Sequence, residues 1–489
     1  MKTNRTLLLY WVSLLYLLIP VVVFVLGWLS WLIALPLTAL ITYVLVSTLP
    51  RSQHPDPTNP FALKTIVFSG LTSLVWVATS GVWNLGFGRT QDWDVMRNDM
   101  LSTLTKYSWP VTSTFAESSS LWTMRHYLAF YLPGPLIGKA TGENLSITLF
   151  ATGAWMALGV WIAFLLLLDL FSRFGNRKYI ILFLFAGFSG LDAIGSRIQG
   201  TLSLRPSSLI NGGHIEWWAE RFQFSSNSTL LHWVPQHAIP SWIGALLVIH
   251  IVRSRKSLSL IPIISVALVL WSPFSALGVT LLAVLLLVNA GLFVEFINST
   301  RAFRFRTFAI LLTAIPLILF LQSGTSEIPQ SFLFSNGDFS HNVALLAKFI
   351  PLEFGLVAIL TGLVVRRTTK EQVVISVALS MVLMVVIGLY NDFAMRVSPA
   401  LLVVIMVNAG EALISPSKSM KNHALRISLG CILAIGSITP LFEIISRHQT
   451  PYNGLQSPCL EGTCESDLTS LGLRSYNWTA APVGVLRNP

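Results

Sequence analysis

Charged side chains are concentrated in one short segment, RTQDWDVMRNDML at residues 89–101, which lies between two long apolar runs. It holds three acids and two arginines in thirteen residues, although only 11% of the whole chain is charged. Near a membrane, such groups are costly unless they have a partner or a task. A carboxylate can take a proton from a hydroxyl group, and an arginine can hold a phosphate. Acid–base or phosphate chemistry at a membrane surface is therefore our first hypothesis for this segment.

Two further segments carry groups that could bind a ligand. The first, LWTMRHYLAFYLPGPLIGK at 121–139, places cations among aromatic residues: Arg125, His126 and Lys139. Its Trp and Tyr residues could equally be interface anchors at the headgroup level. The second, at 212–242, contains His214, Glu216, Trp217, Trp218, Arg221 and His237. Tryptophan rings can stack on sugar faces while the polar groups bind hydroxyls, although an ordinary interfacial loop is an equally good interpretation of this segment.

The sequence predicts neither a metal site nor a cofactor. His214 and Glu216 are two residues apart, whereas a helical zinc pair needs a spacing of four. The net charge of +11 is explained by basic turns of a membrane protein, since no groove-reading or base-stacking motif accompanies it. We therefore expect no nucleic-acid partner, and we expect membrane lipids around the chain.

The elements that must position these residues are apolar helices. The chain has 489 residues, of which 53% are hydrophobic, and a mean hydropathy of +0.68. About 20 apolar residues cross a hydrocarbon core of roughly 30 Å. We predict an all-α integral membrane protein with about thirteen transmembrane helices and extracytoplasmic interfacial helices and loops. The predicted spans are 7–26, 28–48, 64–86, 144–171, 179–195, 240–252, 258–271, 275–296, 307–323, 343–365, 372–390, 398–415 and 427–445.

The positive-inside rule orients these spans. A cytoplasmic N-terminus places a series of short basic turns inside: Arg51 and Lys64, 173–178, 253–256, 301–306, 366–370, and 418–426. The segments 88–142 and 197–239 and the tail from 446 then lie outside. All of the candidate residues above share that outer face, where we expect the chemistry.

The cysteines predict little. Cys431 lies in an apolar run and is expected to be a small buried residue. Cys459 and Cys464 are in the polar tail and could form a disulfide if the tail faces an oxidising compartment.

The layout resembles the C superfamily of integral membrane glycosyltransferases, which use sugars carried on polyprenyl phosphate. The resemblance lies in DVMR at 94–97, in RHYLAFYLPGPLIGK at 125–139, in LLDLFSRFGNRKYIILFLFAGFSG at 167–190, and in NDFAMRVSPALLVV at 391–404. DVMR is similar to the D-E-x-R of the first outer loop in some branches, with Val95 where the second acid would stand.

This resemblance implies transfer of a sugar from a polyprenyl-phosphate-linked donor to a glycan, lipid or protein acceptor on the extracytoplasmic face. Asp94 is the expected base, with Asp92 as the second choice. The donor phosphate would be held by Arg396, Arg125, His126, Lys139 and Arg97, and the sugar or acceptor by the residues of 212–242 given above. Arg396 could instead be a snorkelling arginine or one that pairs with Asp392 on a helix end.

The resemblance also implies an organisation and a location. Residues 64–445 would form the glycosyltransferase-like core, 1–63 two additional N-terminal transmembrane helices, and 446–489 an extracytoplasmic tail. The expected location is the cell envelope, in a bacterial inner (plasma) membrane with the N-terminus cytoplasmic and the C-terminus outside. Two other functions remain open: a polytopic transporter or flippase, and an O-antigen-type polymerase or ligase of lipid-linked glycans.

Overall fold

The computed structural model describes residues 4–49, 61–83, 85, 97–114, 121–201, 214–322, 330–335, 338–388, 391–416, 420–446 and 478–480. Asp92 and Asp94, the two predicted bases, lie outside these ranges, as do Cys459 and Cys464.

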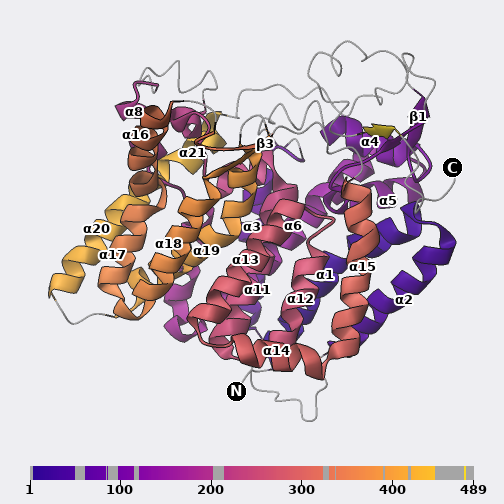
Figure 1. Ribbon diagram of the computed structural model, residues 1–489, viewed down its shortest axis with the longest axis horizontal. Helices are drawn as coiled ribbons and strands as arrows, with labels where there is room; N and C mark the ends of the chain where they lie inside the picture. Colours follow the sequence, from indigo (N-terminus) through magenta and orange to yellow (C-terminus); the bar gives the residue numbers. More distant parts are fainter. Residues whose placement is uncertain are drawn as a thin grey trace.

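Helices make up most of the described structure and strands very little of it, which confirms the all-α prediction (Figure 1). In chain order they are α1 Asn4–Trp28, α2 Trp31–Ser47, α3 Leu63–Ala78, α4 Asn98–Lys106, α5 Pro133–Ala140, α6 Leu145–Leu170, α7 Ile180–Ala186, α8 Asp192–Ile198, α10 Asn227–Trp233, α11 Pro235–Ser254, α12 Ile261–Ala267, α13 Pro273–Asn289, α14 Phe293–Ala302, α15 Arg304–Gln322, α16 Phe339–Ile350, α17 Leu356–Val364, α18 Thr369–Val382, α19 Asp392–Ile414, α20 Met420–Gly436 and α21 Ile438–Ser446.

Short 3₁₀ and π turns link these helices: η2 Leu128–Phe130, η3 Ser172–Tyr179, η4 Ile215–Ala219, η5 Leu258–Leu260, η6 Pro351–Gly355 and η7 Arg366–Thr368. The described strands have three or four residues each. β1 Thr112–Thr114, β2 Leu121–Met124 and β5 Trp478–Ala480 form one antiparallel sheet, and β3 Gln330–Phe332 pairs antiparallel with β4 Val385–Ile387.

Among the described residues, seven helices are long and apolar enough to cross a membrane, or eight if the bent pair α13–α14 is one span. The protein is therefore a multi-pass membrane protein. The predicted count of about thirteen spans is not confirmed. Three of the predicted runs form shorter apolar helices, at Trp31–Ser47, Leu63–Ala78 and Leu258–Ala267.

The predicted span at 179–195 is not one helix. α7 ends at Ala186, and the chain then bends before α8 begins at Asp192. Within the bend, the Leu191 amide donates to the Leu352 carbonyl and the Phe188 carbonyl accepts from Asn227, both over 3.0–3.1 Å. These contacts with other segments replace the helical hydrogen bonds.

The centre of the bundle is built on α11 and α19, whose apolar stretches are 100% and 94% buried. α11 packs against α6, α13 and α19, and α13 packs against α19. Helices buried on all sides need no amphipathic pattern, which is why the middle of each helix is apolar on every side and the charged residues lie near the ends.

The N-terminal helices belong to the same bundle. Tyr16 of α1 stacks on Trp155 of α6 with 4.4 Å between ring centroids, and Trp271 Nε1 donates to the Leu17 carbonyl over 2.9 Å. α2 packs on α1 and α15. The proposed additional pair is thus packed into the core helices.

The two ends of the bundle differ in what they carry (Figure 1). α4, α8, β1 and β3 gather at one end, whereas the N-terminus and α14 lie at the other. We call these the loop end and the N-terminal end.

Cys431 of α20 is exposed, so the prediction that it is a small buried residue is wrong.

Candidate functional site

Arg97 joins two of the predicted segments at the loop end. It directly precedes α4 and is only 3% exposed. Its Nε donates to the Tyr131 hydroxyl over 3.2 Å, and its Nη2 donates to the carbonyl of Trp233. The segments 89–101 and 212–242 are therefore in direct contact at Arg97.

Arg396 comes to the same place from α19. It forms an ion pair with Asp392 over 2.7 Å, one helical turn away, as the alternative interpretation of this arginine expected. It also hydrogen-bonds the Tyr127 side chain. Burial raises the pKa of Tyr127, and the positive charge of Arg396 acts in the opposite direction. Arg396 therefore contacts Tyr127 of the site even though it is paired with Asp392.

His237 lies among these cations, at the start of α11. Its Nδ1 shares a hydrogen bond of 2.6 Å with the Ser272 hydroxyl, and its ring meets that of Tyr127 edge-on at 5.2 Å. Arg396, His126 and Arg97 all act on it electrostatically. The five residues Arg97, His126, Tyr127, His237 and Arg396 are called the basic cluster below.

Buried polar atoms beside the basic cluster lack partners within the described part of the chain. His237 Nε2 has none, and neither does the side-chain amide of Asn391, which precedes the Asp392–Arg396 turn and is 2% exposed. Leaving such groups unpaired costs about 1–3 kcal/mol each. Native proteins keep few of them, and a ligand is one means of pairing them.

An aromatic arm leads away from the basic cluster. The His214 ring lies 4.3 Å from Trp217 and 4.5 Å from Trp233, measured between centroids. Trp217 is 54% exposed, so it offers an open face. Trp233 links the arm to the cluster, because its carbonyl accepts from Arg97 while its Nε1 donates to Glu443 over 2.7 Å.

Two residues predicted for sugar binding have structural contacts instead. Trp218 is 2% exposed and is packed against Phe349, and its Nε1 lies 3.3 Å from both Asp192 and Glu353. In this structure its ring has no free face on which a sugar could stack. Residue type does not show which of two adjacent tryptophans points outward.

Glu216 likewise faces inward. Its carboxylate accepts from the Ser226 amide, the Thr229 hydroxyl and the Gln223 amide over 2.6–3.0 Å. It therefore fixes the loop before α10 rather than facing a ligand. Burial raises the pKa of this carboxyl to about 8.

The remaining predicted residues lie near the cluster or apart from it. Arg125 Nη1 donates to the Leu321 carbonyl over 2.8 Å, and its charge still acts on Tyr127. Lys139 of α5 donates to the Tyr107 carbonyl over 2.6 Å, beside the Trp109 ring. Arg221 is half-buried, and no interaction within the described residues connects it with the basic cluster.

Sequence reasoning missed three polar groups of this site: Ser272, Asn391 and Glu443. Glu443 carried a usable signal, because it is the one acid within the apolar run 427–445 and is buried at 4% exposure. Ser272 and Asn391 carried none, since single hydroxyl and amide residues are common in such chains.

No set of three or more potential metal ligands occurs in the part of the chain that the structure describes.

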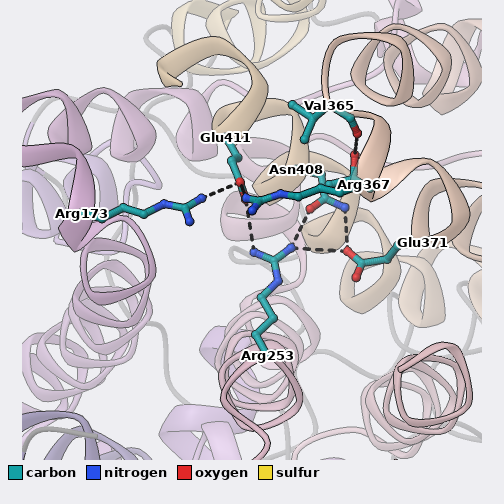
Figure 2. A network of polar contacts seen from close by, with 8 residues as sticks. Arg173, Arg253, Val365, Arg367, Glu371, Asn408 and Glu411 are labelled. Atoms are coloured by element: carbon teal, nitrogen blue, oxygen red, sulfur yellow. Dashed lines mark hydrogen bonds and ion pairs between the residues drawn. The ribbon is translucent and has the colours of Figure 1, made fainter. Parts of the chain in front are cut away.

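A second polar region lies at the N-terminal end. A cavity of about 720 Å³ is lined by charged residues that include Arg5, Asp169, Arg253 and Glu371. Beside it, Arg173, Arg253 and Arg367 converge on Glu411, while Asn408 connects Arg253 with Glu371 (Figure 2). Three of the basic turns thus meet at one end of the bundle.

Comparisons with protein-family models, curated proteins and solved structures found no match to this chain.

Proposed function

We propose that the protein is a membrane glycosyltransferase that moves a sugar from a polyprenyl-phosphate-linked donor to an acceptor. The observation that carries this proposal is the basic cluster at the loop end, where Arg97, His237 and Arg396 converge from three distant segments. Cations in a buried setting suit a phosphate that gains charge as it leaves.

The reaction needs a proton acceptor as well as cations. The acceptor hydroxyl gives its proton to the carboxylate of Asp94, or of Asp92, and its oxygen attacks the anomeric carbon. The bond from that carbon to the phosphate oxygen breaks, and polyprenyl phosphate leaves with the electron pair. In the sequence, Asp94 precedes Arg97 of the basic cluster by three residues.

The aromatic arm supports the sugar side of the proposal. Trp217 presents an exposed ring beside His214, and Trp233 joins this arm to Arg97. A sugar stacked on the arm would have its phosphate at the basic cluster. Trp218 and Glu216 hold the surrounding loop in place.

We place the loop end on the extracytoplasmic face of a bacterial inner (plasma) membrane, as part of cell-envelope synthesis. The basic turns at the N-terminal end support this orientation under the positive-inside rule.

The test is transfer by the purified protein, measured with a panel of polyprenyl-phosphate-linked sugars. The isosteric change Asp94→Asn removes the proton-accepting charge, and we expect turnover to fall on the order of 10²–10⁴-fold with little change in donor binding. Asp92→Asn is the matched control. Normal transfer by the protein with both changes would contradict the proposed chemistry.

A transporter or flippase of lipid-linked sugars is the second candidate, favoured by the charged cavity at the N-terminal end. Alternating access requires openings at both ends, and the Glu411 network could close one of them. Movement of an unchanged lipid-linked sugar across proteoliposomes, without transfer, would favour this candidate over the enzyme.

A further inference from the structure

An apolar groove runs between α17 and α18, beside the start of α20. Its volume is about 1020 Å³, the size of ligand pockets, which span roughly 300–1,000 Å³. Exposed side chains line it, including Ile359, Val373 and Met381 at 61%, 57% and 63% exposure. Small residues, Gly362 and Ser376, leave room between them. Since α17 completes an apolar span, the groove opens to the lipid.

A cation stands at the polar end of this groove. The span that contains α17 ends at Val364, and Arg366 follows two residues later, where headgroups begin. The adjacent Arg367 pairs with Glu411 in the polar network of Figure 2. By contrast, no interaction with another described residue occupies the exposed Arg366 guanidinium.

A buried amide also lacks a partner in this groove. Gln372 lines it and is 3% exposed, yet neither its Nε2 nor its Oε1 has a hydrogen-bond partner within the described residues. It lies near the start of α18, so its depth is just inside that of Arg366. An acyl ester carbonyl at this depth would accept from Nε2.

We propose that the groove binds one anionic phospholipid of the bilayer. An acyl chain lies along Ile359, Val373 and Met381, the ester group meets Gln372, and the phosphate meets Arg366. Charge complementarity selects an anionic headgroup over a zwitterionic one. The phosphate end of the groove, at Arg366, lies near the N-terminal end, and no residue that lines the groove belongs to the basic cluster, so the site is separate from the donor site proposed at that cluster.

The experiment adds phosphatidylglycerol or phosphatidylcholine to delipidated protein in detergent and measures lipid retention by native mass spectrometry. Wild-type protein should retain phosphatidylglycerol preferentially. Arg366→Gln should reduce that retention about five- to tenfold, the effect of one cation at a headgroup. Ser376→Phe should reduce it similarly by filling the groove. Lys370→Gln and Val284→Phe are matched controls at an exposed cation and an exposed apolar position outside the groove, and both should retain the lipid.

Three results would overturn the proposal: equal retention of both phospholipids, a loss with Lys370→Gln as large as with Arg366→Gln, or displacement of phosphatidylglycerol from this groove by polyprenyl phosphate. Melting temperatures without added lipid identify variants that fold poorly. If Arg366→Gln is one of them, Arg366→Lys, which keeps the charge, should retain most of the lipid, and Gln372→Leu should lose part of it. Full retention by Gln372→Leu would remove the ester contact from the proposal.

Discussion

At the loop end, some side chains have polar atoms left over for a ligand, whereas others use all of theirs to hold the loops in place. The basic cluster leaves His237 Nε2 without a protein partner among the described residues. Glu216, by contrast, has three donors around its carboxyl group. Both residues were chosen from the sequence for the same reason, as polar groups in an aromatic segment. Only the contacts separate a ligand-facing group from a structural one.

Glu216 predicts a pH dependence of stability. Burial raises its pKa from 4.5 to about 8, so the folded protein keeps a proton that the unfolded chain releases. The stabilisation from this group is complete below the unfolded pKa and is lost as the pH rises toward the folded pKa. We expect the melting temperature in detergent to fall between about pH 5 and 8, and less so in Glu216→Gln, which cannot ionise. Parallel pH profiles for the two proteins would contradict the shift.

At the scale of elements, α19 connects the two polar ends. Arg396 lies near its start and Asn408 and Glu411 lie near its end, so a shift of this helix would move both regions. The position of α19 is set partly by α13. A Cβ atom added at Gly278 of α13 would clash with the Val397 carbonyl of α19. Backbone contacts of this kind need glycine because any side chain would separate the helices.

Gly278→Ala should therefore disturb the site without touching it. The new methyl group pushes α13 away from the backbone of Val397, which follows Arg396. We expect this change to lower the free energy of unfolding by about 1–3 kcal/mol. We expect a lower melting temperature and reduced sugar transfer. Gly430→Ala on α20 is the matched control, because the nearest atom to its Cβ would be 3.9 Å away. Wild-type melting temperatures and transfer rates in both variants would show that the close contact at Gly278 does not set the position of α19.

The whole molecule shows how far sequence reasoning reaches. Apolar runs predicted helices because burial or lipid contact demands apolar side chains. α6 follows its predicted run closely, whereas α19 begins at Asp392, before the predicted start at 398. Composition did not reveal the break near Phe188, since that bend depends on hydrogen bonds from Asn227 and Leu191.

The candidate site was only partly predictable. Arg97, His237 and Arg396 could be chosen because charged and titratable groups are rare in such a chain. Their meeting could not be derived, because it depends on how α11, α13 and α19 pack. Asn391 was missed because its importance lies in an unpaired amide, which is a property of the fold.

Orientation is a prediction for the whole molecule. Reporters fused after Lys178 or Lys256 should be cytoplasmic, because both follow basic turns. A reporter after Thr463 should be on the outer side. A cytoplasmic signal from the tail would move the proposed site to the other face of the membrane.

The central claim is that the basic cluster holds a lipid-linked phosphate, and binding of polyprenyl phosphate tests it most directly. Arg396→Ala removes a charge-assisted contact worth about 1.5–3 kcal/mol, so affinity should fall roughly tenfold or more. Asp392→Asn leaves the charge of Arg396 in place, and Arg366→Gln changes a residue of the lipid groove. Both variants should therefore bind polyprenyl phosphate normally. We therefore predict a loss of polyprenyl phosphate binding in Arg396→Ala alone. Equal binding by Arg396→Ala and wild-type protein, or no binding by either, would contradict it.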